Sequence, residues 1–267
     1  MNFPLPFTPL DEYKKKFARV KFSRTDGVLT VTLHKDNGEF SWSLAAHREI
    51  STLWNYIGMD PENKVIIITG TGKAFLDRTD YELDTLSQME PMTWALLHQD
   101  AKKIVMDLVE IEQPIICALN GPVSTLSQIP MLCDIILATP EATISEALHL
   151  PHMIPGDGHH IVWPLLLGLN RAKYLIFTRK ALSAREALEE RIVSEIVDRE
   201  NLLPRANELA RQLLEVNPVA LRYLRPVMMQ SVKRALLDGV SMGLLAEGYA
   251  ALRRVPAGPQ LGLPETH

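Results

Sequence analysis

The fold of this chain is decided by residues 114–145, which read PIICALNGPVSTLSQIPMLCDIILATPEATIS. Two short apolar runs, 114–119 and 134–138, flank an Asn-Gly-Pro turn and a short helical stretch. Continuous apolar runs of this length are typical of strands in a parallel sheet that is buried on both faces. The segment therefore predicts two parallel strands joined by a right-handed crossover.

The same alternation continues toward the N-terminus. An Asp-Gly turn separates two alternating runs, 18–23 and 28–34, and predicts a hairpin. A helical pattern at 43–56 leads to another buried strand at 64–69, and a long helix is expected at 91–112. Strands and helices that alternate at this spacing predict an α/β core.

Beyond about residue 164 the strand signals nearly vanish. Helices are expected at 171–178, 184–190, 202–215, 220–230 and 232–253. The predicted organisation is a loose N-terminal arm, an α/β core, a helical C-terminal oligomerisation region and a loose tail. These four parts are assigned to residues 1–16, 17–200, 201–255 and 256–267.

Composition excludes several classes of protein. The 267 residues carry a formal net charge of −4, so the chain lacks the excess of positive charge that would bind nucleic acid or an anionic membrane. No window of about 18 residues is apolar and free of charge, so no membrane-spanning helix is expected. Cys117 and Cys133 lie in apolar runs and are expected to be reduced core residues. We therefore expect a globular cytoplasmic protein.

Two pattern matches carry little weight. The segment Gly239-Val-Ser-Met-Gly243 fits a nucleophile elbow, but it lies in a helical stretch, and the only later histidine is His267. The segment Gly70-Thr-Gly-Lys73 lacks the spacing of a phosphate-binding loop and is interpreted as a turn at a strand end. Neither match predicts a serine hydrolase or a nucleotide site.

Four of the eight histidines, His149, His152, His159 and His160, fall within twelve residues. Two prolines interrupt this segment, which predicts a loop, and no zinc-ligand spacing supports a metal site there. A Pro-Gly turn can fold Asp157 back onto the ring of His149, where a carboxylate would fix the tautomer of a histidine base. The alternative is that the histidines are half-buried loop residues and that Asp157 caps the following helix.

Glu247 lies in the helical segment LLAEGYAAL, at the edge of an arc formed by Val240, Leu244 and Ala251. A carboxyl group beside apolar neighbours has a raised pKa and can serve as an acid. An edge position is also consistent with exposure to solvent, so the pattern leaves both roles open.

Three blocks of the sequence together resemble the crotonase (enoyl-CoA hydratase/isomerase) superfamily. They are VIIITGTGKAFLDRTDYELD at 65–84, the segment at 114–145, and PGDGHHIVWPLLLGLNRAKYLIFTRKALSAREALEERIVSEIVD at 155–198. The resemblance runs from about residue 18 to residue 253. It implies the crotonase-like repeated ββα spiral core with a helical C-terminal extension.

The departures from the superfamily pattern bear on function. Hydratases of this superfamily use two glutamates, and the resemblance places Gln128 at the first of these positions. With a one-residue gap, it places His149 at the second. Glutamine cannot exchange a proton as an acid or a base, so hydration by two glutamates is not expected.

The same departures are similar to those of the β-diketone hydrolase branch, typified by 6-oxocamphor hydrolase. The similarity rests on NGPV, His-x-Pro before PGDG, Ile161-Val-Trp-Pro and a late helix glutamate. It implies a catalytic dyad of His149 and Asp157, a further catalytic role for Glu247, and Trp42 as an active-site residue. It also implies that no coenzyme A is used, and no cofactor or metal is expected.

The chain departs from this branch at one position. The branch has a histidine in the turn after NGPV, where this chain has Leu126. The candidates for the role of that histidine are Ser127, Gln128 and His152. The superfamily binds an oxyanion through two backbone N–H groups, which the resemblance places at Thr79 and near Leu126.

The chemistry implied by the resemblance is retro-Claisen cleavage of a cyclic or bicyclic β-diketone. Water adds to one carbonyl, the carbon between the two carbonyls leaves as an enolate, and the enolate is protonated. His149 would activate the water, while Glu247 would protonate the product or position the water. Two alternatives stay open: a coenzyme A thioester enzyme of the same superfamily, and a catalytically silent subunit. The resemblance also implies a homotrimer or a dimer of trimers.

Overall fold

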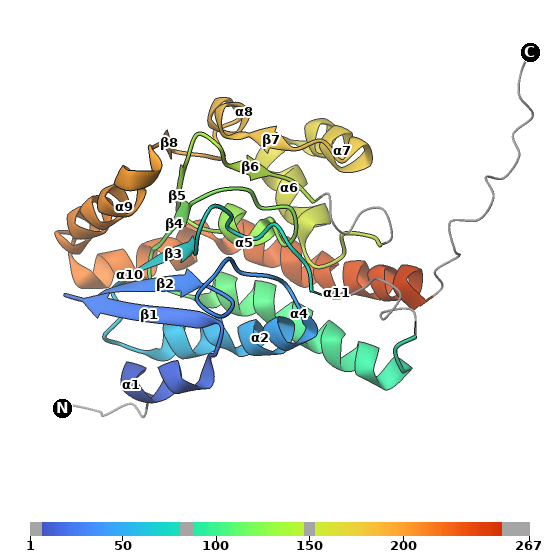
Figure 1. The fold of residues 1–267 in the computed structure, drawn as a ribbon, viewed down its shortest axis with the longest axis horizontal. Helices are drawn as coiled ribbons and strands as arrows, with labels where there is room; N and C mark the ends of the chain where they lie inside the picture. Colours follow the sequence, from blue (N-terminus) through green and yellow to red (C-terminus); the bar gives the residue numbers. More distant parts are fainter. Residues whose placement is uncertain (1–6, 81–87, 147–152, 253–267) are drawn as a thin grey trace, which may run out of the picture.

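The computed structural model describes residues 7–80, 88–146 and 153–252, and a six-stranded sheet runs through its centre (Figure 1). The strand order is β1-β2-β3-β4-β5-β8, in which β1 and β2 form an antiparallel hairpin and every later pair is parallel. The strands are β1 Val20–Thr25, β2 Val28–Leu33, β3 Val65–Gly70, β4 Ile115–Leu119, β5 Ile135–Ala138 and β8 Glu195–Ile196. The expected α/β class is confirmed.

The strand β3 is covered on both faces, as its continuous apolar sequence predicts. Successive side chains of a strand point to opposite faces. Ile66 and Ile68 belong to the large core cluster under α2 and α4, whereas Val65 and Ile67 pack into a second cluster with α9. The sheet is therefore the middle layer between two sets of helices.

The helices surround this sheet and continue beyond it as a C-terminal helical region (Figure 1). They are α1 Leu10–Tyr13, α2 Leu44–Met59, α4 Pro91–Glu110, α5 Gln128–Met131, α6 His159–Leu167, α7 Leu169–Thr178, α8 Ala184–Glu189, α9 Arg199–Leu214, α10 Pro218–Met228 and α11 Gln230–Leu252. The long helix α11 packs against α4 and α6. No helix in the described ranges combines the length and the hydropathy needed to cross a membrane.

Short extended segments form a second, smaller layer. Trp42 pairs with Thr79, and Val123 pairs with both Leu76 and Ile144. The strands of a further antiparallel pair are β6 Thr143–Ile144 and β7 Leu182–Ser183. Each of the strands β2 to β5 is thus followed by a short extended piece in this layer, which gives the repeated ββα arrangement.

Asn120 explains why the turn after β4 reads Asn-Gly. Its Oδ1 accepts a hydrogen bond from the N–H of Gly70 at 2.9 Å, and its Nδ2 donates to the carbonyl oxygens of Gly72 and Ala74. A Cβ on Gly121 would lie 1.7 Å from a carbonyl oxygen of the neighbouring turn, so only glycine fits there. The amide therefore joins the turns that follow β3 and β4.

The expectation of a loose arm over residues 1–16 is wrong for residues 10–16. Helix α1 and the 3₁₀ helix η1 Lys14–Lys16 follow each other there, and Tyr13 is fully buried. Its ring packs against Phe22 and Tyr56, at centroid distances of 5.6 and 5.8 Å. Burial of this aromatic side chain outweighs the entropy that a free arm would keep. The other proposed boundaries remain predictions, and the tail at 256–267 lies outside the described residues.

Candidate active site

A pocket lies between the N-terminal end of α2, the helices α4 and α11, and the turn before α6. Its lining residues are Trp42, Leu44, His47, Trp94, Leu97, His98, Ala101, Met153, Asp157, Leu244 and Glu247. Three predicted site residues, Trp42, Asp157 and Glu247, therefore meet although they are far apart in the sequence. A mostly apolar wall with a few convergent polar groups is typical of a small-molecule site.

Close packing of α11 on the Pro-Gly-Asp-Gly turn brings Glu247 to the pocket. A Cβ on Gly156 would lie 2.1 Å from the carbonyl oxygen of Gly243, and a Cβ on Gly243 would lie 2.1 Å from Cε1 of His160. A Cβ on Gly239 would similarly lie 2.8 Å from Cδ1 of Ile161. The Gly-x-Ser-x-Gly match is therefore a helix-packing surface.

Glu247 is buried, with 9% of its surface exposed, and its carboxyl accepts a hydrogen bond from the N–H of Gly156. Burial raises the pKa of Glu247 well above its usual range, and the charges of Asp157 and Glu146 raise it further, against the opposing charge of His159. Its Oε2 has no hydrogen-bond partner in the described part of the chain. Glu247 is thus a buried carboxyl group with a raised pKa and not a solvent-exposed edge residue.

Asp157 contacts His159, one of the four clustered histidines, which the sequence patterns do not single out. Nδ1 of His159 lies 2.8 Å from Oδ1 of Asp157, and Nε2 of the same ring contacts Oε2 of Glu146. Burial lowers the pKa of His159, but the two carboxylates outweigh that effect and raise the pKa to about 10. His159 is the first residue of α6, and Asp157 does not cap that helix: the N-cap is Gly158, without a side-chain bond.

Ser127 and Gln128, two candidates for the role of the missing branch histidine, are fully buried. The amide of Gln128 donates to the backbone oxygen of Asp157 at 3.0 Å. The hydroxyl of Ser127 donates to Glu146 at 3.4 Å and accepts a bond from the indole N–H of Trp163 at 3.2 Å. Neither side chain lines the pocket. Gln128 instead holds the turn that carries Asp157, and Ser127 holds Glu146.

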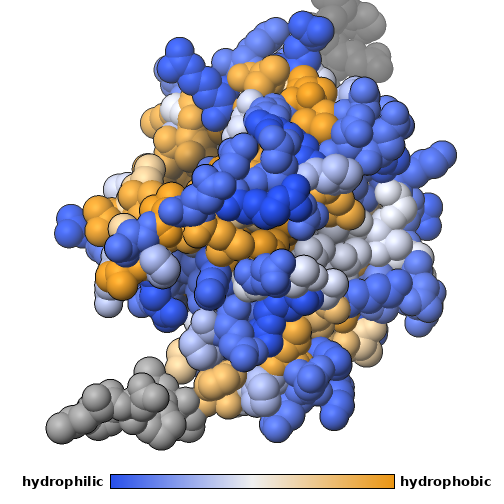
Figure 2. Space-filling model, turned by 90° about the vertical axis from the view of Figure 1, so that its left-hand side faces the viewer, coloured by the Kyte–Doolittle hydropathy of each residue, from blue (hydrophilic) through white to orange (hydrophobic). Residues whose placement is uncertain are grey.

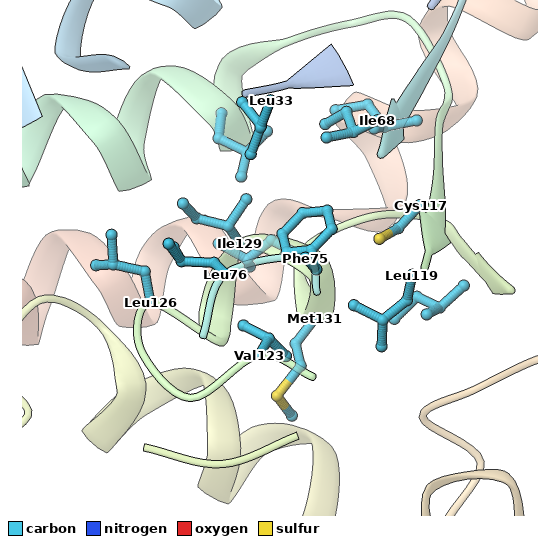
Figure 3. Close-up of a cluster of buried hydrophobic side chains, with 14 of the residues drawn as sticks. Leu33, Ile68, Phe75, Leu76, Cys117, Leu119, Val123, Leu126, Ile129 and Met131 are labelled. Atoms are coloured by element: carbon cyan, nitrogen blue, oxygen red, sulfur yellow. The ribbon is translucent and has the colours of Figure 1, made fainter. Parts of the chain in front are cut away.

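The two predicted oxyanion positions follow β3 and β4. Trp42 donates its N–H to the carbonyl of Arg78 and accepts from the N–H of Asp80. In such parallel pairing the N–H of the intervening Thr79 points away from Trp42. Leu126 has a left-handed backbone, with φ of 51°. Its side chain belongs to the apolar core cluster shown in Figure 3, so only its backbone is available for an oxyanion.

The predicted base is not part of the described structure. His149 and His152 lie outside the described residues, so the proposed pairing of His149 with Asp157 stays a prediction. Two pocket histidines, His47 and His98, were not predicted. His47 lies one helical turn after Leu44 on α2, a spacing that could have indicated a shared face. For His98, burial and the nearby Lys102 lower the pKa, so its ring is neutral at pH 7.

Comparison with known proteins agrees with this fold. The family model described as enoyl-CoA hydratase/isomerase matches residues 23–244. The chain therefore belongs to the enoyl-CoA hydratase/isomerase family, which is the crotonase superfamily.

The relatives fall into two groups. A short-chain-enoyl-CoA hydratase from Clostridium acetobutylicum is 27% identical over 226 residues, which are 84% of each chain. A β-diketone hydrolase from the cyanobacterium Anabaena sp. PCC 7120, solved with (S)-3-oxocyclohexyl acetic acid, is 34% identical with a TM-score of 0.87, and the match covers 94% of this chain and 98% of that one. An enoyl-CoA hydratase from Bacillus anthracis shares the fold, with 24% identity, a TM-score of 0.71 and coverage of 88% and 90%.

Proposed function

We propose that this chain hydrolyses a carbon–carbon bond of a cyclic or bicyclic β-diketone without a cofactor. The observation that carries the proposal is the meeting of Asp157, Glu247 and Trp42 in one apolar pocket. Retro-Claisen cleavage needs a base for water and an acid for the leaving carbon, and the pocket holds Asp157 beside Glu247, whose pKa is raised by burial. The resemblance to the Anabaena β-diketone hydrolase supports the choice of substrate class.

The proposed reaction begins with water and the diketone. His149, oriented by Asp157, takes a proton from water while the water oxygen bonds to one carbonyl carbon. The tetrahedral intermediate then breaks the bond to the central carbon, which leaves as an enolate and yields a carboxylic acid. Glu247 delivers its proton to the enolate carbon, and the proton held by His149 returns the carboxyl group of Glu247 to its starting state. One water is consumed and one carbon–carbon bond is broken.

Hydrogen-bond donors would stabilise the negative oxygen during this reaction. We assign the backbone N–H groups of Thr79 and Leu126 to that role and the indole of Trp42 to a carbonyl oxygen. Trp42 is supported by its place in the pocket wall, where its ring packs against His47 at a centroid distance of 5.5 Å. His152 is proposed to fill the role of the missing branch histidine.

The direct test is incubation of the purified protein with a panel of cyclic 1,3-diketones, followed by the loss of enolate absorbance and by detection of the keto acid. Cleavage is expected for the wild type, with a loss of at least about 10²-fold for His149→Ala and for Asp157→Asn. Activity that survives both substitutions would overturn the dyad.

Two other functions are distinguished by the same protein sample. Saturable binding and turnover of an enoyl-CoA, without diketone cleavage, would favour a coenzyme A thioester enzyme, as the sequence relatives suggest. A folded oligomer that turns over neither class would favour a catalytically silent subunit.

We also propose a homotrimer or a dimer of trimers in the cytoplasm. The face shown in Figure 2, which carries α9 and α10, displays a band of hydrophobic residues between hydrophilic ones. Exposed apolar residues of α10 include Val219, Tyr223, Leu224, Val227 and Met228. An apolar helix face of this kind is typical of an interface. A trimer of the 30.0 kDa chain has a mass of about 90 kDa, measurable by light scattering.

A further inference from the structure

A chain of polar contacts runs from the protein core to the floor of the pocket. It starts at the indole of Trp163, passes through Ser127 to Glu146, and continues through both nitrogens of His159 to Asp157. We call Glu146, His159 and Asp157 the buried triad. His159 and Glu146 are 0% and 2% exposed, and neither lines the pocket, whereas Asp157 does.

The geometry fixes the ring of His159 from both sides. Glu146 follows β6, and Asp157 belongs to the turn that precedes α6, so the two carboxylates approach from different elements. Nδ1 of His159 is hydrogen-bonded to Oδ1 of Asp157, and Nε2 lies in ion-pair contact with Oε2 of Glu146. A positively charged ring is attracted to both carboxylates, whereas a neutral ring balances neither. The neutral ring would leave one buried carboxylate facing an unprotonated nitrogen.

The surroundings of the triad contain further titratable groups. Glu247 of α11 is close enough for its charge to interact with all three members. His160 turns its Nδ1 toward the carbonyl of Pro155, at 3.1 Å. Ser127 and Gln128 from the α5 side are uncharged, and α4 packs the apolar Val105 near Gly158. In the described part of the chain, His159 is thus the cation that contacts both carboxylates.

We propose that His159 is a positioning residue that stays an imidazolium, holds Oδ1 of Asp157 in place and keeps Asp157 ionised beside Glu247. The inference rests on the proposed function, because Asp157 acts there as the carboxylate that orients the base. The bond from His159 engages Oδ1, one of the two oxygens of this carboxylate, and so fixes the orientation of the Asp157 side chain at the pocket. Glu146 contacts His159 on the side remote from the pocket, and its negative charge helps to keep the ring protonated.

The consequence of losing His159 follows from the charges. Without the imidazolium, the carboxylates of Glu146, Asp157 and Glu247 would share one buried site, and one of the first two would take up a proton at neutral pH. A protonated Asp157 no longer stabilises a charged base. The loss of activity should therefore be recovered in part at higher pH, which a merely structural role does not predict.

The first experiment does not depend on activity. Histidine ring signals of the isotope-labelled, full-length protein are followed by NMR from pH 5 to pH 9.5, with His159 assigned by its absence in His159→Gln. We expect His159 to keep the signature of a doubly protonated ring through pH 8.5, while His34, whose pKa burial lowers, loses its charge below pH 6.5. In Glu146→Gln the ring of His159 is expected to titrate at least one pH unit lower. A neutral His159 ring at pH 7 in the wild type would overturn the proposal.

The second experiment uses the pH dependence of kcat/KM for diketone cleavage. His159→Gln is expected to shift the midpoint of the acid limb upward by at least one pH unit, and His34→Gln, a histidine remote from the pocket, is expected to leave it unchanged. An unchanged profile in His159→Gln would refute the positioning role. If His159→Gln does not fold, the NMR titration of Glu146→Gln decides the same question, because the ring of His159 must then titrate at a lower pH than in the wild type. If the wild type does not cleave diketones, the proposed function fails, and the NMR titration still decides the state of His159.

Discussion

The backbone of Gly156 lies directly against the backbone of Gly243, closer than any side chain would permit. Because these two glycines touch, α11 is seated on the Pro-Gly-Asp-Gly turn, and Glu247, one helical turn beyond Gly243, receives the N–H of Gly156. The position of the proposed acid therefore depends on the absence of two side chains.

Gly156→Ala tests this dependence. The added Cβ would lie 2.1 Å from the carbonyl oxygen of Gly243, so α11 must move away from the turn. We expect a loss of about 1–3 kcal/mol in the free energy of unfolding and a fall in kcat of at least tenfold. Urea denaturation and diketone turnover measure the two effects. In the matched control Gly38→Ala, the nearest atom to the new Cβ is 3.4 Å away, and little change is expected. Full activity in Gly156→Ala would contradict the argument.

Glu247→Gln separates the chemical role of the side chain from its packing. Glutamine resembles a protonated glutamate in shape and charge, and burial with neighbouring carboxylates raises the pKa of Glu247. Compared with the wild type, the variant is therefore expected to have the same free energy of unfolding at pH 7 and a higher one at pH 9. Its kcat is expected to fall by about 10²–10⁴-fold. The control Glu189→Gln, on the exposed side of α8, should change neither. A stable variant with wild-type kcat would show that Glu247 is not the acid.

The stability of the protein is expected to decrease as the pH rises from about 6.5 to 10. The folded pKa of His159 is raised to about 10, so its stabilising contribution is fully present below the unfolded value near 6.5 and is lost through the folded value. The raised pKa of Glu247 acts in the same direction. The slope approaches about −1.4 kcal/mol per pH unit for one proton. Urea denaturation at pH 6, 7, 8 and 9 measures it, and a slope as steep in His159→Gln would exclude His159 as the cause.

Arg225 and Arg222 offer a comparison of a buried and an exposed ion pair on α10. Arg225 is buried, pairs with Asp134 at 2.9 Å and donates to the carbonyls of Val109, Ile111 and Leu132. Arg225→Ala is expected to cost about 2–4 kcal/mol, because it leaves three carbonyl oxygens inside the protein and the partly exposed carboxylate of Asp134 without their donor. Arg222→Ala breaks an exposed pair with Glu112 and should cost less than about 1 kcal/mol. Equal losses in thermal or urea denaturation would contradict this difference.

Much of the fold could be predicted because its strands are continuous apolar runs. The run at residues 64–69 predicts β3 within one residue of its observed bounds, Val65–Gly70, and the helical pattern at 91–112 predicts α4. The strands β6, β7 and β8 were missed because each is two residues long, too short for any periodicity. Helix α1 was missed because the burial of Tyr13 depends on rings that lie on other elements.

The candidate site was less predictable than the fold, because its residues are far apart in the sequence and come together only in the folded structure. Asp157, Glu247 and Trp42 were chosen from motifs, and all three line the pocket. Glu146 was not predicted because it looks ordinary after a short extended piece, and His159 was noted only as a member of the histidine cluster, without a role of its own. Only their approach to Asp157 in space makes them a unit, and no residue spacing encodes that approach.

The seating of α11 on the turn has a consequence for the order in which this enzyme matures. Asp157 and Trp42 belong to the first two thirds of the chain, whereas the proposed proton donor lies close to its end. During synthesis all six strands of the sheet emerge before Glu247 does, so the sheet can pair before the donor exists. Under the proposed function, the donor is therefore added to a sheet that is already complete, and a nascent chain that lacks α11 holds Asp157 without its proposed partner acid.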